Sequence, residues 1–226
     1  MNENEQLIYR LLLAVDIQAY SLRRTREQLL AQRQLAEALD KAAAGAGLDR
    51  NRWAKQVGGD GEMATLPEDV DPADVAGDFV IGLSDELRAI NAASSPRLRV
   101  RLSLHHGTLT AGPFGPAGDA PIVVQRLLDS TPLRRLLIDD TERDVAFVVS
   151  DTLYEDVVRT GFCALQPSAF QRIKVKAKGA VFRGHIFVGG AQAGDEGSAA
   201  HRGGPGHRPA PGARLYEFPV PVPCEA

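Results

Sequence analysis

The chain has 226 residues, of which 44% are hydrophobic and 24% charged, and this balance is that of a globular protein large enough to bury a core. A net charge of -3 at pH 7 excludes a broadly basic protein of the kind that binds nucleic acid. No apolar run approaches the roughly 20 residues that a membrane-spanning helix needs, and no signal peptide opens the chain. Two cysteines without zinc-ligand spacing are typical of a reducing compartment, so we expect a cytoplasmic protein.

Strand and helix patterns alternate through the first half of the sequence. Residues 7–17 form a nearly unbroken apolar run, which is typical of a central strand covered on both faces. Residues 23–44 repeat alanine and leucine every three or four positions and predict a helix with one buried stripe. The stretch RWAKQVGGDGEMATLP (52–67) predicts two short strands around a GGDG turn. DPAD then predicts a helix with Asp71 as N-cap and Pro72 at the first helical position.

The second half opens with the clearest strand. Residues 97–107 place leucine and valine at every second position, so we expect one buried and one polar face, followed by a neighbouring strand at 107–112. The later predicted elements are helices over 119–130 and 132–139, a strand over 145–150, a helix over 151–159 and two strands within 170–190. Beyond these the chain is rich in Gly, Pro and Ala. We therefore expect a folded domain over residues 1–188 and a disordered tail over 189–226.

Two aspartates are the first candidates for chemistry. Asp16 ends the first strand and Asp60 lies in the GGDG turn, so pairing of strand 7–17 with strand 52–57 would bring both carboxylates to one edge of the sheet. Ionised carboxylates that close repel each other unless a cation lies between them, and such hard oxygen ligands suit Mg²⁺ or Mn²⁺. The alternative is structural, with Asp16 capping the next helix and Asp60 shaping a hairpin. The residues alone leave both interpretations open.

Five motifs in order resemble class III nucleotidyl cyclases. They are LLAVDIQAYS, QVGGDGEMATLP, RVRLSLHHGTL, AGDAPIVVQRLLD and VKAKG with RGHIFVG, where that family carries DIxGF[TS], a GD hairpin, RxG[IL]HxGx[VL], GDxVNxxxR and a closing VKxKG strand pair. The similarity covers residues 7–188. It implies an α+β fold, the ferredoxin-like class III cyclase sandwich of a mostly antiparallel sheet covered by helices. It also implies conversion of a nucleoside triphosphate to a 3′,5′-cyclic nucleotide and pyrophosphate.

The resemblance assigns roles to individual residues. Asp16 and Asp60 match the aspartates that hold two divalent ions, Mg²⁺ or Mn²⁺, and the backbone carbonyl of Ile17 would be a further ligand. Arg126 matches the arginine that stabilises charge on the α-phosphate in the transition state; on its own it also fits an exposed arginine in a surface ion pair. Lys178 resembles a phosphate-contacting lysine, and a solvated hairpin lysine is the alternative.

Other positions depart from the family pattern. The base-reading lysine of the family is Gln56 here, its partner aspartate falls at Gly115, and the ribose-orienting asparagine is Ile122. Metal binding is therefore expected to be kept, base recognition to be remodelled and ribose positioning to be lost. Ser21 belongs to a stretch, AYS, whose backbone amides could face phosphate oxygens at the start of a helix. The neighbouring histidines at 105–106 lack metal-ligand spacing and are expected to be structural.

The family's site is built across two subunits, with the metal carboxylates on one and the arginine on the other, so the resemblance implies a homodimer. Three functions remain open. The first is a divergent cyclase acting on a nucleoside triphosphate in intracellular signalling. The second is a catalytically degenerate domain that binds a nucleotide or a protein partner, and the third is a scaffold without a ligand. A diguanylate cyclase is discounted because Gly61 stands where that family carries an acidic residue.

Overall fold

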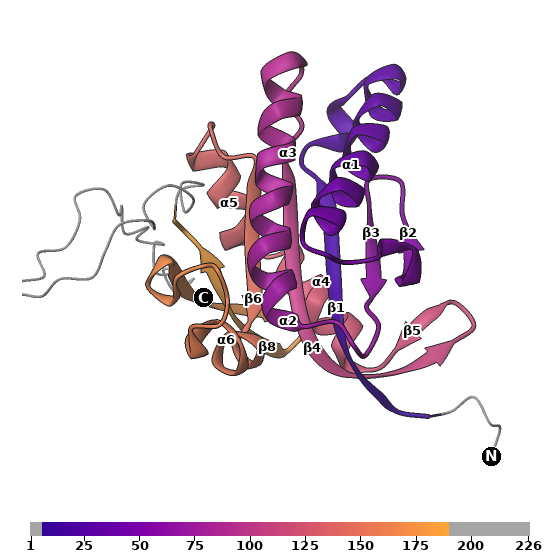
Figure 1. Ribbon diagram of the computed structural model, residues 1–226, viewed down its shortest axis with the longest axis vertical. Helices are drawn as coiled ribbons and strands as arrows, with labels where there is room; N and C mark the ends of the chain where they lie inside the picture. Colours follow the sequence, from indigo (N-terminus) through magenta and orange to yellow (C-terminus); the bar gives the residue numbers. More distant parts are fainter. Residues whose placement is uncertain (1–5, 190–226) are drawn as a thin grey trace, which may run out of the picture.

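The computed structural model describes residues 6–189, so the tail predicted over 189–226 lies outside the described residues except for its first glycine. Within them, eight strands form one sheet in the order β2-β3-β1-β4-β6-β8-β7, with β5 paired to β4 alone (Figure 1). All neighbouring strands of this described sheet run antiparallel except β4 and β6. The strands are β1 (Ile8–Ile17), β2 (Ala54–Val57), β3 (Gly61–Thr65), β4 (Val100–Gly112), β5 (Gly115–Ala117), β6 (Val145–Ser150), β7 (Phe170–Ala177) and β8 (Ala180–Phe187).

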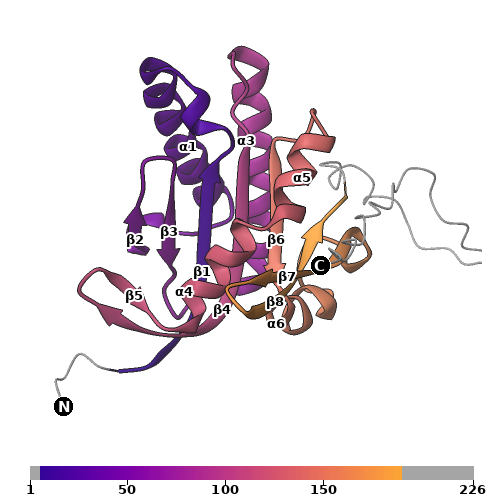
Figure 2. The same cartoon turned by 180° about the vertical axis from the view of Figure 1, so that it is seen from behind.

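Helices cover both faces of the sheet. They are α1 (Thr25–Gly45), α2 (Pro72–Asp74), α3 (Val80–Ala93), α4 (Asp119–Leu128), α5 (Thr131–Asp139) and α6 (Asp151–Asp156). Figures 1 and 2 show α1 and α3 on one side of the sheet and α4 and α5 on the other. The order of the helices agrees with the predicted one, as does that of the strands except around β4 and β5, and the fold is the predicted α+β sandwich.

Strand β1 serves two hydrophobic cores at once. Leu11, Leu13 and Val15 pack with α1 and α3, whereas Leu12 and Ala14 pack with α4 and α5. Because both faces are covered, successive positions of the strand all require apolar side chains, which explains the unbroken apolar run in the sequence. The run ends at the acidic residue that follows Val15.

The buried face of α1 and the N-cap of α2 agree with the sequence prediction. In α1 the predicted stripe is buried; it consists of Ala31, Leu35, Leu39 and Ala42. The Asp71 carboxylate accepts the backbone N–H of Ala73 and caps α2, with Pro72 at the first position. A π-helical turn over Val75–Phe79 then joins α2 to α3.

Three details of the predicted sheet are wrong. The neighbour of β1 is β3 and not strand 52–57, since β3 carries the buried Ala64 whereas β2 is exposed along its length and forms the edge. Residues 107–112 continue β4, because the chain reverses only after Gly112 and β5 pairs back from there. The expected polar face of β4 is covered, and Ser103 is fully buried, because α4 and α5 lie over that face.

Candidate functional site

The GGDG turn is held against the end of β1 by backbone contacts. Asp16 pairs with Gly61 across the β1–β3 ladder, and the Ile17 N–H donates to the Asp60 carbonyl at 2.8 Å. A Cβ at Gly61 would lie 1.9 Å from the Val15 carbonyl oxygen, so only glycine permits this approach. The local sequence therefore places Asp16 near the C-terminal end of β1 and Asp60 beside it, just before β3 begins.

The Asp16 carboxylate is buried and ion-paired. Arg101, its partner across the β1–β4 ladder, donates from Nε to Oδ1 at 2.8 Å and from Nη2 to Oδ2. Burial nevertheless raises the pKa of Asp16 to about 6, against the lowering effect of Arg101, and the charges of Asp60 and Asp129 raise it further. Burial is the larger effect, so this carboxylate binds a proton more readily than an exposed aspartate does. The carboxylate does not cap the next helix, which was the structural alternative.

Arg101 is a site residue that the sequence reasoning missed. Its Nη1 atom is buried and has no hydrogen-bond partner among residues 6–189, although Nε and Nη2 are both used by Asp16. A buried unpaired N–H group costs free energy, and Arg101 bears this cost where its other two N–H groups hold Asp16. The strand alternation placed Arg101 on the same face as Ser103, but only the pairing register puts that face beside Asp16.

The acidic pair fits a hard divalent cation. Asp60 is exposed and has no ion pair within the described range 6–189, and Asp16, Asp60 and Arg101 together carry one net negative charge. No group of three or more His, Cys, Asp or Glu side chains in residues 6–189 is arranged to hold a metal. Two carboxylates are nevertheless a sufficient protein contribution for Mg²⁺, whose remaining ligands are commonly waters and substrate phosphates.

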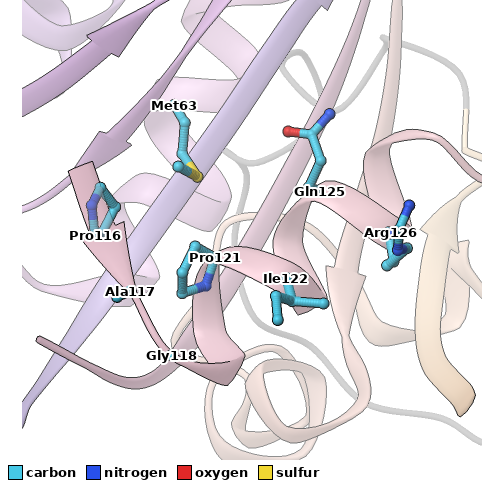
Figure 3. Close-up of a pocket in the computed structure, with 8 residues that line it drawn as sticks. All are labelled: Met63, Pro116, Ala117, Gly118, Pro121, Ile122, Gln125 and Arg126. Carbon is cyan, nitrogen blue, oxygen red and sulfur yellow. The ribbon is translucent and has the colours of Figure 1, made fainter. Parts of the chain in front are cut away.

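A shallow cavity of about 400 Å³ lies between β3, β5 and α4 (Figure 3). It is lined by Met63, Pro116, Ala117, Gly118, Pro121, Ile122, Gln125 and Arg126. Apolar groups make up most of this wall, and Ile122 is 49% exposed. Arg126 reaches the wall from α4 and forms no ion pair within residues 6–189, so the surface ion pair considered above is not seen there. Its guanidinium is available to a ligand.

The two positions expected to read the base lie in contact. Gln56 on β2 donates from Nε2 to the Phe114 carbonyl at 3.0 Å. Gly115 follows with φ +119°, and a Cβ there would lie 2.8 Å from the Gln56 Oε1 atom. Gln56 is therefore tied to the backbone of the β4–β5 hairpin, and this contact leaves little room for a side chain at position 115.

Lys178 lies apart from this arrangement, and Ser21 is not at the start of a long helix. Lys178 lies in an exposed turn just before the first residue of β8. Asp16 pairs with Arg101, and the strand register carries this level of the sheet across β6 to the last residue of β8. Lys178 is therefore separated from the level of Asp16 by the length of β8, which is about 26 Å for eight residues at about 3.3 Å each. Ser21 is exposed in a 3₁₀ turn over Tyr20–Leu22, and α1 begins only at Thr25, so Ser21 does not start that helix.

Both histidines of β4 have local structural contacts. His105 shares a 2.8 Å hydrogen bond between Nδ1 and the Ser150 hydroxyl, and burial lowers the pKa of His105 to about 4. His106 stacks against Tyr9 with ring centroids 4.3 Å apart. Both histidines thus have contacts within the fold, to Ser150 and Tyr9.

Comparison with known proteins identifies the fold. No protein-family model and no curated protein sequence matches the chain. Among solved structures it is similar to an adenylate/guanylate cyclase/hydrolase from Silicibacter pomeroyi, with TM-score 0.59 and 19% identity over 81% of this chain and 98% of the other. It is also similar to the guanylate cyclase domain of RhGC from Catenaria anguillulae in complex with GTP, with TM-score 0.55 and 18% identity over 82% and 97%.

A third similar structure is the non-canonical dimeric guanylyl cyclase domain of a RhoGC fusion protein from Blastocladiella emersonii, with TM-score 0.55 and 14% identity over 81% and 98% of the two chains. The chain therefore has the class III adenylate/guanylate cyclase fold, as its motifs predicted, in a divergent sequence. Within residues 6–189, none of the helices has the length and apolarity needed to cross a lipid bilayer.

Proposed function

We propose that the protein is a divergent nucleotidyl cyclase that converts a nucleoside triphosphate into a 3′,5′-cyclic nucleotide and pyrophosphate for intracellular signalling. The observation that supports the proposal is that Asp16 and Asp60 are backbone neighbours, through the Asp16–Gly61 pairing and the Ile17–Asp60 hydrogen bond, and that the charge of Asp60 raises the pKa of Asp16. Asp16, Asp60 and the Ile17 carbonyl would hold Mg²⁺ or Mn²⁺. Two such ions, when bound, lower the pKa of the ribose 3′-hydroxyl and neutralise triphosphate charge.

The chain's own residues would act on the triphosphate as cations. In the reaction the 3′-oxygen bonds to the α-phosphorus, the bond to the β-phosphate oxygen breaks, pyrophosphate leaves and the hydroxyl proton passes to water. Arg126 would donate to the α-phosphate oxygens as charge develops there. Arg101 would hold the Asp16 carboxylate in position through its two hydrogen bonds from Nε and Nη2.

The same geometry favours a site shared between two copies. Lys178 lies about 26 Å along β8 from the row of Asp16, too far to contact the same phosphates within one chain. A two-fold homodimer would place Lys178 and Arg126 of one copy opposite the aspartates of the other. A triphosphate substrate and cysteine usage without disulfide spacing both support a cytoplasmic setting.

Recognition of the nucleoside is expected to be loose. Gln56 is occupied by the Phe114 carbonyl, and Gly115 has no side chain, so neither offers a specific pair of hydrogen bonds to a base. The Ile122 side chain cannot donate a hydrogen bond to a ribose oxygen. Displacement of the reacting hydroxyl by about 1 Å can lower the reaction rate about a hundredfold. We therefore expect slow turnover with little discrimination among the four nucleotides.

A second function is favoured by two specific observations, the ion pair that Asp16 forms with Arg101 and the apolar Ile122. It is binding of the metal–nucleotide complex without turnover, as a regulatory module. In that case bound nucleotide would stabilise the dimer for a protein partner, and no cyclic product would form.

One experiment separates the two functions. The purified full chain is incubated with each of ATP, GTP, CTP and UTP and with Mn²⁺ or Mg²⁺, and cyclic nucleotides are measured by mass spectrometry. Thermal unfolding is followed in parallel. The matched variants are Asp60→Ala and Asp139→Ala, the latter removing an exposed carboxylate on α5. Formation of a cyclic nucleotide that is lost in Asp60→Ala and kept in Asp139→Ala supports the cyclase. Metal-dependent thermal stabilisation by a nucleotide without cyclic product supports the binding module. If no product forms and no stabilisation is seen, both functions are rejected.

A further inference from the structure

The β7–β8 hairpin concentrates positive charge in a chain whose net charge is negative. Three of the five lysines of the whole sequence lie in its first strand and turn, and no Asp or Glu occurs between residues 157 and 189. The chain as a whole has a net charge of -3. The hairpin forms one edge of the sheet, with β7 outermost (Figure 2).

The strand register gathers these cations on one face. On β7, Arg172 and Lys174 are exposed, while the alternating Ile173 is buried against the core under α4 and α5. Arg183 on β8 lies directly opposite Lys174, so the two side chains share the face. Directly opposite residues have Cβ atoms about 5 Å apart, and residues two apart on one strand are separated by about 7 Å.

Protection of a sheet edge does not account for this arrangement. Lysines on an edge strand do discourage pairing with another chain, and that reason suffices for Lys174 on β7. Arg183, however, belongs to the inner strand β8, one residue beyond the β6–β8 register, and a like charge directly opposite Lys174 destabilises the sheet. This repulsion is relieved when an anion binds between the two side chains.

The surface at this point is hollowed, and little charge within it is balanced. A depression of about 530 Å³ is lined by Arg172, Ile173, Lys174 and Arg183. Arg172 pairs with Asp151 of α6 at 3.2 Å, but neither Lys174 nor Arg183 has an ion pair within residues 6–189. Asp151 also closes one end of the positive surface, so the space suits a small ligand better than a long polymer.

We propose that Lys174, Arg183 and Arg172 form a second anion site, which binds a small ligand carrying two or more linked phosphate groups. Arginine pairs with phosphate through two parallel N–H groups, and lysine adds a compact point charge that can rotate toward a neighbouring phosphate. The site needs no divalent metal. It goes beyond the proposed function, since none of its three residues belongs to the candidate cyclase site.

The test is isothermal titration calorimetry of the full chain with inorganic tripolyphosphate in EDTA. An Arg126→Ala background removes the unpaired arginine of the candidate cyclase site, and EDTA removes its metals, so this result is independent of the cyclase. In that background, Lys174→Gln/Arg183→Gln should lose at least tenfold in affinity. The control variant Lys41→Gln/Arg88→Gln removes two exposed cations from α1 and α3, and it should change the affinity for tripolyphosphate less than twofold. The variant Lys174→Arg/Arg183→Lys keeps both charges, so its affinity should stay within about threefold of the background protein. Retained affinity in this variant shows that substitution at the two positions does not by itself unfold the site.

Further arms of the same titration identify the ligand. ATP bound as tightly as tripolyphosphate supports recognition of the phosphate chain alone, and tighter ATP binding supports a nucleotide as its source. The proposal is overturned if tripolyphosphate binds Lys174→Gln/Arg183→Gln as tightly as the background protein. It is equally overturned if sulfate at matched ionic strength binds as well as tripolyphosphate.

Discussion

The two ends of helix α4 face different kinds of surface. The ionic group of Asp16, Arg101 and Asp60 lies near the C-terminal end of α4, where the charge of Asp129 raises the pKa of Asp16. Near the N-terminal end of α4 the cavity wall is apolar and includes the half-exposed Ile122. The ionic group is built into the ladders of three strands, so its loss would cost folding stability. The cavity wall consists of surface side chains, which can change with little cost to folding stability.

The largest expected effect tests how firmly the ionic end is built into the fold. Arg101→Met leaves the buried Asp16 carboxylate without its partner, and breaking a buried pair in this way costs about 3–5 kcal/mol. Urea unfolding at pH 7.5 measures the loss. The double variant Asp16→Leu/Arg101→Met removes both charges and should regain most of the stability. Equal losses in the single and double variants would show that packing, and not the unpaired charge, is responsible.

The next effect concerns the hairpin that carries Asp60. Gly61→Ala places a Cβ within van der Waals overlap of the Val15 carbonyl, so β3 must shift from β1 at a cost of about 3 kcal/mol. Gly59→Ala is the matched control, because a Cβ there meets no atom within 4 Å, and it should cost less than about 1 kcal/mol. The same urea titrations compare the two. Similar losses would mean that the turn is adaptable and does not fix Asp60.

The protonation of Asp16 sharpens the comparison further. Its folded pKa is about 6, above the usual unfolded value of about 3.9, so the folded state binds the proton more tightly. The unfolding free energy should therefore fall as the pH rises from about 4 to about 6, by at most about 3 kcal/mol from this group. Asp16→Asn removes the effect, and the measurement is the difference between wild type and Asp16→Asn across that range.

Bound metal should remove this dependence of the unfolding free energy on pH. A cation bound at Asp16 lowers the carboxyl pKa, so Mn²⁺ should abolish the loss of stability near pH 6 in wild type and leave Asp60→Ala less affected. The histidines contribute in the opposite direction, since burial lowers the pKa of His105 to about 4 and its stabilisation is lost as the pH falls. Comparison with Asp16→Asn cancels that contribution. An identical pH profile in wild type and Asp16→Asn would contradict the assignment.

The sequence predicted most of the helices and strands because they depend on local patterns, and it marked Asp16 and Asp60 as candidates. The apolar run of β1 and the alternation of β4 are visible along the chain, and Asp60 follows two glycines at a turn. Arg101 could not be predicted, because its role depends on the register that places it opposite Asp16, 85 residues away. The pairing of β1 with β3 was likewise missed, since two short strands flanking one turn compete for the same neighbour.

The smallest expected effect is a gain at the other end of α4. Ile122→Asn restores a hydrogen-bonding side chain at the cavity wall, and better placement of the ribose should raise cyclic nucleotide formation about tenfold, or about 1.4 kcal/mol. Because Ile122 is half exposed, stability should change by no more than about 0.5 kcal/mol. Ile138→Asn replaces an exposed isoleucine of α5 and should leave the rate unchanged. If Ile122→Asn leaves the rate of product formation where it was, the divergence of the cavity wall does not limit turnover, and the contrast between the two ends of α4 has no catalytic meaning.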